Sequence, residues 1–126
     1  MRIKIWTTAT GDVPGELLEE KNPKTVEVIR KILPIKTRVA TWGDEIYFTI
    51  NAKAKAENTQ SIVEKGDIAY WPPGDALCIF FGFTPVSTKD EIRPASPVNI
   101  VGKVLSDSTI FKNVKNGEEI LIDKMQ

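Results

Sequence analysis

The chain has 126 residues, the length of one domain (1–126), and its 17 basic side chains balance its 17 acidic ones. This balance argues against a nucleic-acid or anionic-membrane partner, and the apolar runs are too short to span a bilayer, so the expected location is the cytoplasm. The absence of histidine and the single cysteine, Cys78, exclude a disulfide, a histidine-activated nucleophile and a cysteine metal cluster.

The chain begins with an alternating segment, Arg2 to Thr7, which predicts a short strand with one core-facing side. Thr8 to Glu16 contains two glycines and a proline, so we expect a turn-rich connection there. The pair Leu17-Leu18 fits either the end of a strand or part of a helix.

Asn22-Pro23 predicts the start of a helix, because Asn is a favoured N-cap and Pro fits the first helical position. Pro34 predicts its end. Between them, apolar residues recur at helical spacing, which indicates a helix of about three turns that packs one side against a sheet.

Ile35 to Ile50 predicts a hairpin with Gly43-Asp44 at its tip. A two-residue loop pairs Trp42 with Glu45 and, farther from the turn, Val39 with Phe48 and Arg38 with Thr49. Alternation then separates an apolar core face from an outer face that carries a cation, two aromatic rings and a carboxylate. The outer face comprises Arg38, Ala40, Trp42, Glu45, Tyr47 and Thr49.

Asp67 to Phe83 predicts a second hairpin, which turns at a Pro/Gly cluster beginning at Pro72. A four-residue loop pairs Trp71 with Ala76. Neither face of this hairpin is polar, so both must be covered by other chain or by a ligand. One face comprises Ile68, Tyr70, Leu77, Ile79, Phe81 and Phe83, and the other comprises Ala69, Trp71, Ala76, Cys78 and Phe80.

The remaining chain predicts a long irregular loop followed by two more strands. Thr84 to Pro97 holds three prolines and mixed charges, which are typical of a surface loop. Val98 to Leu105 resumes a strand, in which Gly102 marks a bulge or a close backbone approach. A short helix or turn follows at Ser106 to Asn116, and Glu119 to Lys124 closes the chain as a strand. Six to eight short strands with one helix favour a closed β-barrel, which has no exposed edge.

Several segments resemble a known family. Pro23 to Glu27 (PKTVE) and Val101 to Val104 (VGKV) are similar to the first helix and a strand of the cyclophilins. Trp42 to Phe48 (WGDEIYF), Gly66-Asp67 and Tyr70 to Gly74 (YWPPG) resemble small prokaryotic cyclophilin-like proteins of uncharacterised function. The resemblance spans nearly the whole chain. It implies a mainly β fold: a closed, eight-stranded, mostly antiparallel barrel with one or two capping helices.

The resemblance also suggests a catalytic candidate. The cyclophilin motif F-H-R-V aligns with Lys36 to Val39, which makes Arg38 the guanidinium that would favour a twisted prolyl amide. A tryptophan and a histidine of the family fall on Arg93 and Val98 in this chain.

The leading hypothesis is a groove that binds a peptide or small molecule, with weak or no prolyl isomerase activity. The alternatives are an active isomerase that uses Arg38 and a protein-interaction or assembly module, for which a homodimer is allowed. We expect no metal or cofactor. Each candidate also has a structural interpretation: the aromatic residues suit packing on the barrel wall or under the helix, and Cys78 suits a small core residue. The predicted ligand-binding residues are Trp42, Glu45, Tyr47, Trp71 and Phe80.

Overall fold

The computed structural model describes residues 1–125 as nine strands, one α-helix and two short 3-10 helices. Helix α1 spans Pro23–Ile32, and the 3-10 helices span Pro72–Gly74 and Ser108–Asn113. Within these residues, no helix has the length and apolar character needed to cross a membrane. The strands are β1 Arg2–Thr7, β2 Gly11–Leu17, β3 Ile35–Arg38, β4 Ala40–Thr41, β5 Glu45–Thr49, β6 Asp67–Trp71, β7 Ala76–Phe80, β8 Asn99–Val104 and β9 Glu119–Lys124.

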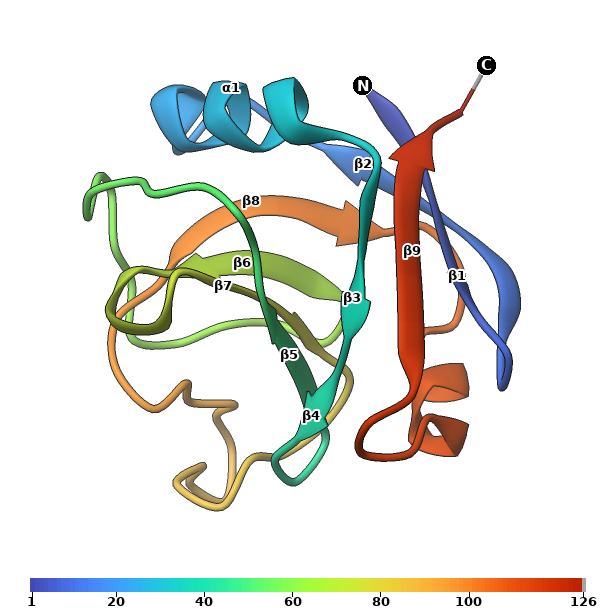
Figure 1. The fold of residues 1–126 in the computed structure, drawn as a ribbon. Helices are drawn as coiled ribbons and strands as arrows, with labels where there is room; N and C mark the ends of the chain where they lie inside the picture. Colours follow the sequence, from blue (N-terminus) through green and yellow to red (C-terminus); the bar gives the residue numbers. More distant parts are fainter. Residues whose placement is uncertain (126) are drawn as a thin grey trace.

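The strands form one antiparallel sheet in the order β3-β9-β1-β2-β8-β6-β7-β5-β4, which curls into a nearly closed barrel (Figure 1). Its two end strands, β3 and β4, are consecutive parts of one chain segment that changes partner at Val39. The Val39 N–H donates to the Glu118 carbonyl at 2.9 Å, and its own carbonyl accepts from the Gly117 N–H at 2.7 Å. The expected barrel is confirmed, with nine strands rather than eight because this segment counts as two.

The change of partner corrects the predicted 35–50 hairpin. The two pairs farthest from the turn, Arg38 with Thr49 and Val39 with Phe48, are wrong. Only the pairs nearer the turn form, and Arg38 lies opposite Glu119 of β9. Hairpin reasoning considers only neighbours in sequence, whereas closing the barrel requires β3 to pair with the last strand of the chain.

The predicted connection at 8–16 is also wrong, because β2 begins at Gly11 and continues the β1 hairpin. Pro14 is tolerated because its carbonyl points toward the β8 side, where it accepts from the Leu105 N–H at 2.9 Å. Its missing N–H therefore breaks no bond to β1. A β-carbon at Gly15 would lie 3.2 Å from Ile3, so glycine leaves room for the core side chain opposite.

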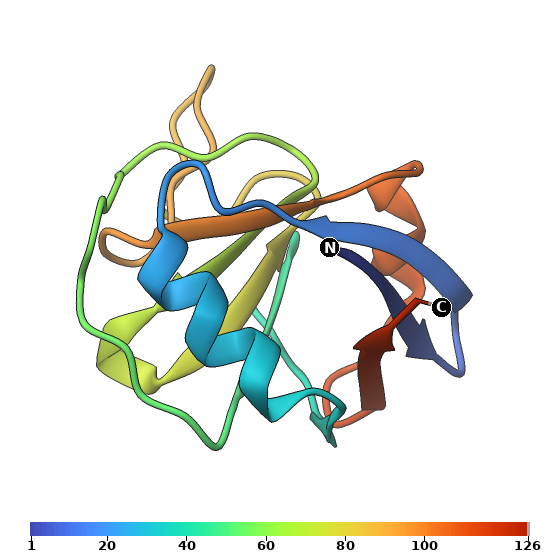
Figure 2. The same ribbon diagram turned by 90° about the horizontal axis from the view of Figure 1, so that it is seen from above.

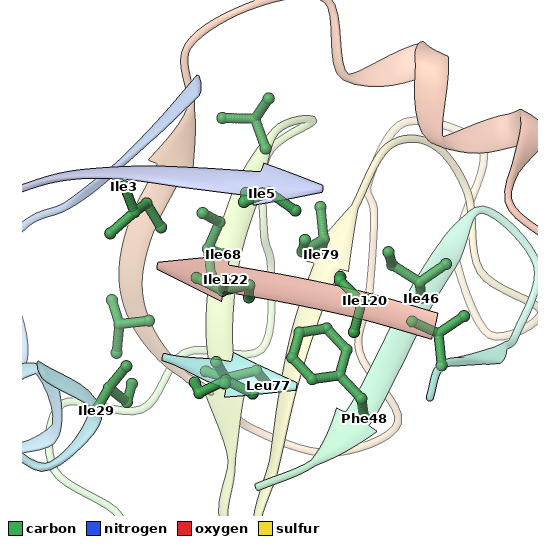
Figure 3. Close-up of a cluster of buried hydrophobic side chains, with 14 of the residues drawn as sticks. Ile3, Ile5, Ile29, Ile46, Phe48, Ile68, Leu77, Ile79, Ile120 and Ile122 are labelled. Atoms are coloured by element: carbon green, nitrogen blue, oxygen red, sulfur yellow. The ribbon is translucent and has the colours of Figure 1, made fainter. Parts of the chain in front are cut away.

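The barrel interior is filled by alternate residues of almost every strand, as the alternation predicts (Figure 3). The inward face of the 67–83 hairpin joins this core, and the predicted register is confirmed, with Trp71 opposite Ala76. Phe83 is an exception: it is 54 % exposed, because the chain leaves the barrel wall after Phe81. The core includes Ile3, Ile5, Ile46, Phe48, Ile68, Leu77, Ile79, Ile120 and Ile122.

A second apolar cluster covers the outer face of the same hairpin, so both faces are covered, as expected. The covering chain comes from the segments around 60–63 and 92–98, which form backbone bridges between Gln60 and Val98 and between Val63 and Ile92. Helix α1 lies across one end of the barrel instead (Figure 2). The outer cluster contains Val63, Ala69, Cys78, Phe80, Val98 and Ile100, with Tyr47, Trp71 and Ile92 packed against it.

The predicted helix is confirmed, and Asn22 occupies the N-cap position as predicted, although its side chain does not cap the helix. The Asn22 side chain makes no capping bond; it donates to the Ile100 carbonyl and accepts from the Asn58 N–H. Glu57 takes the capping role from a distant loop, accepting from the backbone N–H groups of Lys24 at 3.2 Å and Thr25 at 3.1 Å. Although desolvation opposes it, these bonds and the Thr25 hydroxyl lower the pKa of Glu57.

Replacing Glu57 with Ala should destabilise the protein by about 1 kcal/mol, because two helix-terminal N–H groups lose their acceptor. Urea unfolding of the variant and of the exposed control Glu19→Ala provides the measurement. Equal midpoints for the two variants would show that Glu57 does not stabilise the helix.

The last part of the barrel follows the sequence closely. Strand β9 has the predicted bounds, and a short 3-10 helix precedes it. Gly102 has both predicted properties: the β6–β8 register shifts beside it, and a β-carbon there would lie 2.2 Å from the Glu16 carbonyl oxygen. Strands β2 and β8 can therefore pair only with glycine at this position.

Candidate functional site

The β4–β5 turn places two functional side chains on the outside of the barrel. The Trp42 N–H donates to the Glu45 carbonyl at 2.9 Å across the turn. Gly43 has a φ of 59°, a left-handed conformation that suits glycine, and it packs against the backbone at Phe83. Since alternation points Ile46 into the barrel, Glu45 and Tyr47 point away from it.

Neighbouring strands bring further side chains beside this turn. Tyr47 of β5 lies opposite Cys78 of β7, and Cys78 in turn lies opposite Ala69 of β6. Trp71 ends β6 on the same outer face. The strand register therefore gathers an aromatic ring, a thiol and an indole around Glu45.

The 84–97 loop supplies the remaining wall. Its base is tied by the Ser87 hydroxyl, which accepts from the backbone N–H groups of Thr84 at 2.9 Å and Arg93 at 3.0 Å. The Trp71 indole Nε1 donates to the Ser96 Oγ at 2.6 Å. This bond holds the loop against the barrel, so one pocket residue fixes the position of the segment that covers it.

These elements enclose a pocket of about 190 Å³ on the outer face of the barrel. This volume is below the range of roughly 300–1,000 Å³ common for ligand sites, so it suits a small ligand or a single side chain. Its walls are mainly aromatic and aliphatic. The lining residues are Trp42, Glu45, Tyr47, Trp71, Cys78, Pro94, Ala95 and Val98.

Glu45 is the acidic residue of this wall. It is 5 % exposed, and no described residue forms a hydrogen bond with its Oε1. Burial raises the pKa of the carboxyl to about 7, while a hydrogen bond with the Cys78 thiol acts in the opposite direction. Burial and the adjacent Glu45 raise the pKa of the thiol well above its usual range. The site therefore combines a carboxyl that titrates near neutral pH with a neutral thiol.

Comparison with known families identifies the fold. The model of the cyclophilin-like family matches residues 1–123. The chain belongs to the cyclophilin-like family. A comparison with curated proteins finds no match.

Two solved structures share this cyclophilin-like fold. One is the solution structure of a hypothetical protein from Archaeoglobus fulgidus, with 45 % identity and a TM-score of 0.83, covering 99 % of this chain and 95 % of that one. The other is McbB in complex with tryptophan, with 17 % identity and a TM-score of 0.75, covering 97 % of this chain and 44 % of that one. The likeness to McbB shows the fold alone.

Four of the five predicted ligand-binding residues line the pocket of this cyclophilin-like barrel: Trp42, Glu45, Tyr47 and Trp71. Phe80 does not line it. This ring is fully buried in the outer apolar cluster, on the strand beside Glu45.

Arg38, the candidate guanidinium, is not part of this pocket wall. It is exposed at the end of β3, and its Nη1 donates to the Gly117 carbonyl at 3.0 Å. The alignment with the cyclophilin motif suggests Arg38, but strand β3, which carries this residue, pairs with β9 and not with β5.

The pocket also contains residues that the sequence analysis did not assign to it. Cys78 is a buried residue of the outer apolar cluster, which confirms its interpretation as a small core residue, and it also lines the pocket. Its carboxyl neighbour lies on another strand and is not evident from sequence. Pro94, Ala95 and Val98 belong to an irregular loop and its exit, where no periodicity predicts which way a side chain points. Among the described residues, no group of three His, Cys, Asp or Glu could hold a metal ion.

Proposed function

We propose that this cyclophilin-like protein binds a small molecule in the pocket around Glu45. The observation that carries the proposal is a buried carboxyl oxygen without a protein partner in a wall shared with three aromatic side chains. Buried polar groups are almost always hydrogen-bonded, so an exception in a pocket suggests a ligand that supplies the bond. The aromatic rings offer contact area at little cost in conformational entropy.

The position of Arg38 argues against prolyl isomerisation as the main activity. A guanidinium that stabilises a twisted amide must lie at the substrate nitrogen. Arg38 is outside the pocket wall and bonds to the Gly117 carbonyl. We therefore expect no isomerisation of a short X-Pro peptide above the uncatalysed rate, and Arg38→Ala should leave ligand binding unchanged.

The test is a screen of small aromatic fragments by protein-observed NMR. It includes free tryptophan, because McbB, which shares the fold, was solved with that molecule. Ligands should shift the side-chain signals of Trp42, Tyr47 and Trp71. Trp42→Ala should weaken binding about tenfold, since it removes one aromatic wall worth roughly 1.4 kcal/mol.

Trp6→Ala is the matched control. Trp6 is a half-buried tryptophan on β1, outside the pocket wall, so its removal should leave the affinity unchanged. A screen in which no fragment shifts the pocket signals would refute the proposed function. So would binding that Trp42→Ala does not weaken.

A further inference from the structure

The charge distribution around the pocket favours a particular class of ligand. The faces of Trp42, Tyr47 and Trp71 carry the negative end of the ring quadrupole, which attracts cations. Glu45 adds a carboxyl to the same wall. The carboxyl and the ring faces of this wall therefore favour a cation over an anion.

Within the described part of the chain, no cationic side chain offsets this wall. Among residues 1–125, no salt bridge involves Glu45, and neither Lys nor Arg lines the pocket. In the loop, Arg93 directly precedes the pocket residue Pro94, but its guanidinium pairs with the Glu91 carboxylate at 2.6 Å. On the turn side, the Asp44 carboxylate lies 3.8 Å from the Lys112 ammonium. A buried carboxylate without a cation is costly, so a cation that enters the pocket would be stabilised strongly.

We propose that the ligand is a small organic ammonium ion, whose N–H group donates to Glu45 Oε1 while its charge and apolar body lie against the aromatic side chains. This inference rests on the proposed function and specifies its ligand class. The pocket volume limits the ligand to a short amine, on the scale of one aromatic ring with a brief chain.

Binding of such a cation should be linked to protonation of Glu45. Because the pKa of this carboxyl is about 7, a large share of free protein is protonated at neutral pH. The titratable groups that face it are the Tyr47 phenol on its own strand and the Cys78 thiol on β7, whereas Trp71 of β6 and the loop residues Pro94, Ala95 and Val98 do not titrate. The ammonium must displace the carboxyl proton, so affinity should fall by up to about tenfold per pH unit below 7.

A series of three compounds of similar shape tests the ligand class: 2-phenylethylamine, 2-phenylethanol and 3-phenylpropanoate. Calorimetry at pH 8 should give the tightest binding for the amine, at least tenfold tighter than for the alcohol, and the weakest for the carboxylate. At pH 5.5, amine binding should weaken at least tenfold while alcohol binding changes little. Titrations at pH 6 in two buffers of different ionisation enthalpy should show that binding of the amine releases protons and that binding of the alcohol does not.

Glu45→Gln keeps the shape of the side chain and removes its charge. In this variant the preference for the amine over the alcohol should fall to the part that the aromatic rings supply, and binding should show no pH dependence and no proton release. Glu19→Gln, which removes an exposed carboxylate outside the pocket, should behave as wild type. Trp42→Leu provides a second test that leaves Glu45 in place, and it should weaken the amine more than the alcohol.

The outcomes separate this inference from the proposed function. Equal affinity for amine and alcohol, or amine affinity independent of pH, would overturn the ammonium assignment while leaving a small-molecule site intact. If none of the three compounds binds in the pocket, the ammonium proposal fails. If the broader fragment screen also finds no ligand there, the proposed function fails with it.

Discussion

Glu45→Gln should make the protein more stable than wild type by about 3 kcal/mol at pH 8, and this pH-dependent gain should disappear below pH 4.5. The carboxyl titrates with a pKa of about 7 in the folded protein against an ordinary value of 4.5. Each pKa unit corresponds to about 1.4 kcal/mol, so the difference amounts to roughly 3 kcal/mol. Such a cost is a large part of the stability of a typical domain.

The sign follows from proton binding. Between pH 4.5 and 7 the folded state binds more protons at Glu45 than the unfolded state, so rising pH destabilises the fold. The stabilising contribution of the protonated form is complete below pH 4.5 and is lost as the pH rises through 7. Glutamine does not titrate, so the variant lacks this loss.

Urea unfolding at pH 4.5, 6 and 8 measures the effect as the difference between variant and wild type. The pH-independent cost or gain of the amide cancels when the three differences are compared. Glu19→Gln should show no such trend. If the difference in unfolding free energy between variant and wild type stays constant from pH 4.5 to 8, Glu45 titrates normally. If this difference increases with pH, the site sacrifices stability for a charge at the position where a ligand binds.

Sequence reasoning located most of this site because it depends on hairpin register. The Gly43 turn fixes Trp42 against Glu45, and alternation fixes Tyr47 on the same face. The second hairpin contributes Trp71 in the same way. These are interactions between neighbours in sequence, so their geometry follows from local pattern.

The features that sequence did not predict depend on partners far apart in the chain. Arg38 pairs with β9 instead of β5, because the barrel closes only when β9, some eighty residues later, has a partner. Glu57 caps a helix that starts more than thirty residues earlier. Pro94 and Ala95 reach the pocket because the loop is tied to the barrel by Ser96, which accepts from the indole of Trp71, and by the bridges at Ile92 and Val98. The burial of Glu45 follows from these long-range contacts, so hairpin register places this side chain on the outer face but does not predict its burial.

Phe80→Ala should destabilise the protein by about 3–5 kcal/mol, the usual cost of removing a fully buried aromatic ring. Phe80 is 0 % exposed, yet it points away from the barrel interior and packs in the outer apolar cluster. The stability of this variant therefore tests whether the outer cluster acts as a second core. Phe83→Ala is the matched control, since Phe83 is 54 % exposed and its loss should change stability by no more than about 0.5 kcal/mol.

The outcome also bears on the pocket. The outer cluster joins Phe80 to Cys78 and Val98, which line the pocket, so a cavity at Phe80 should loosen that wall and weaken amine binding along with stability. Phe80→Leu, which keeps most of the apolar volume, should lose less of both. If Phe80→Ala were as mild as Phe83→Ala in urea unfolding, the outer layer would be a loose covering. A pocket that needs its polar and aromatic groups held in fixed positions could not then rest on it.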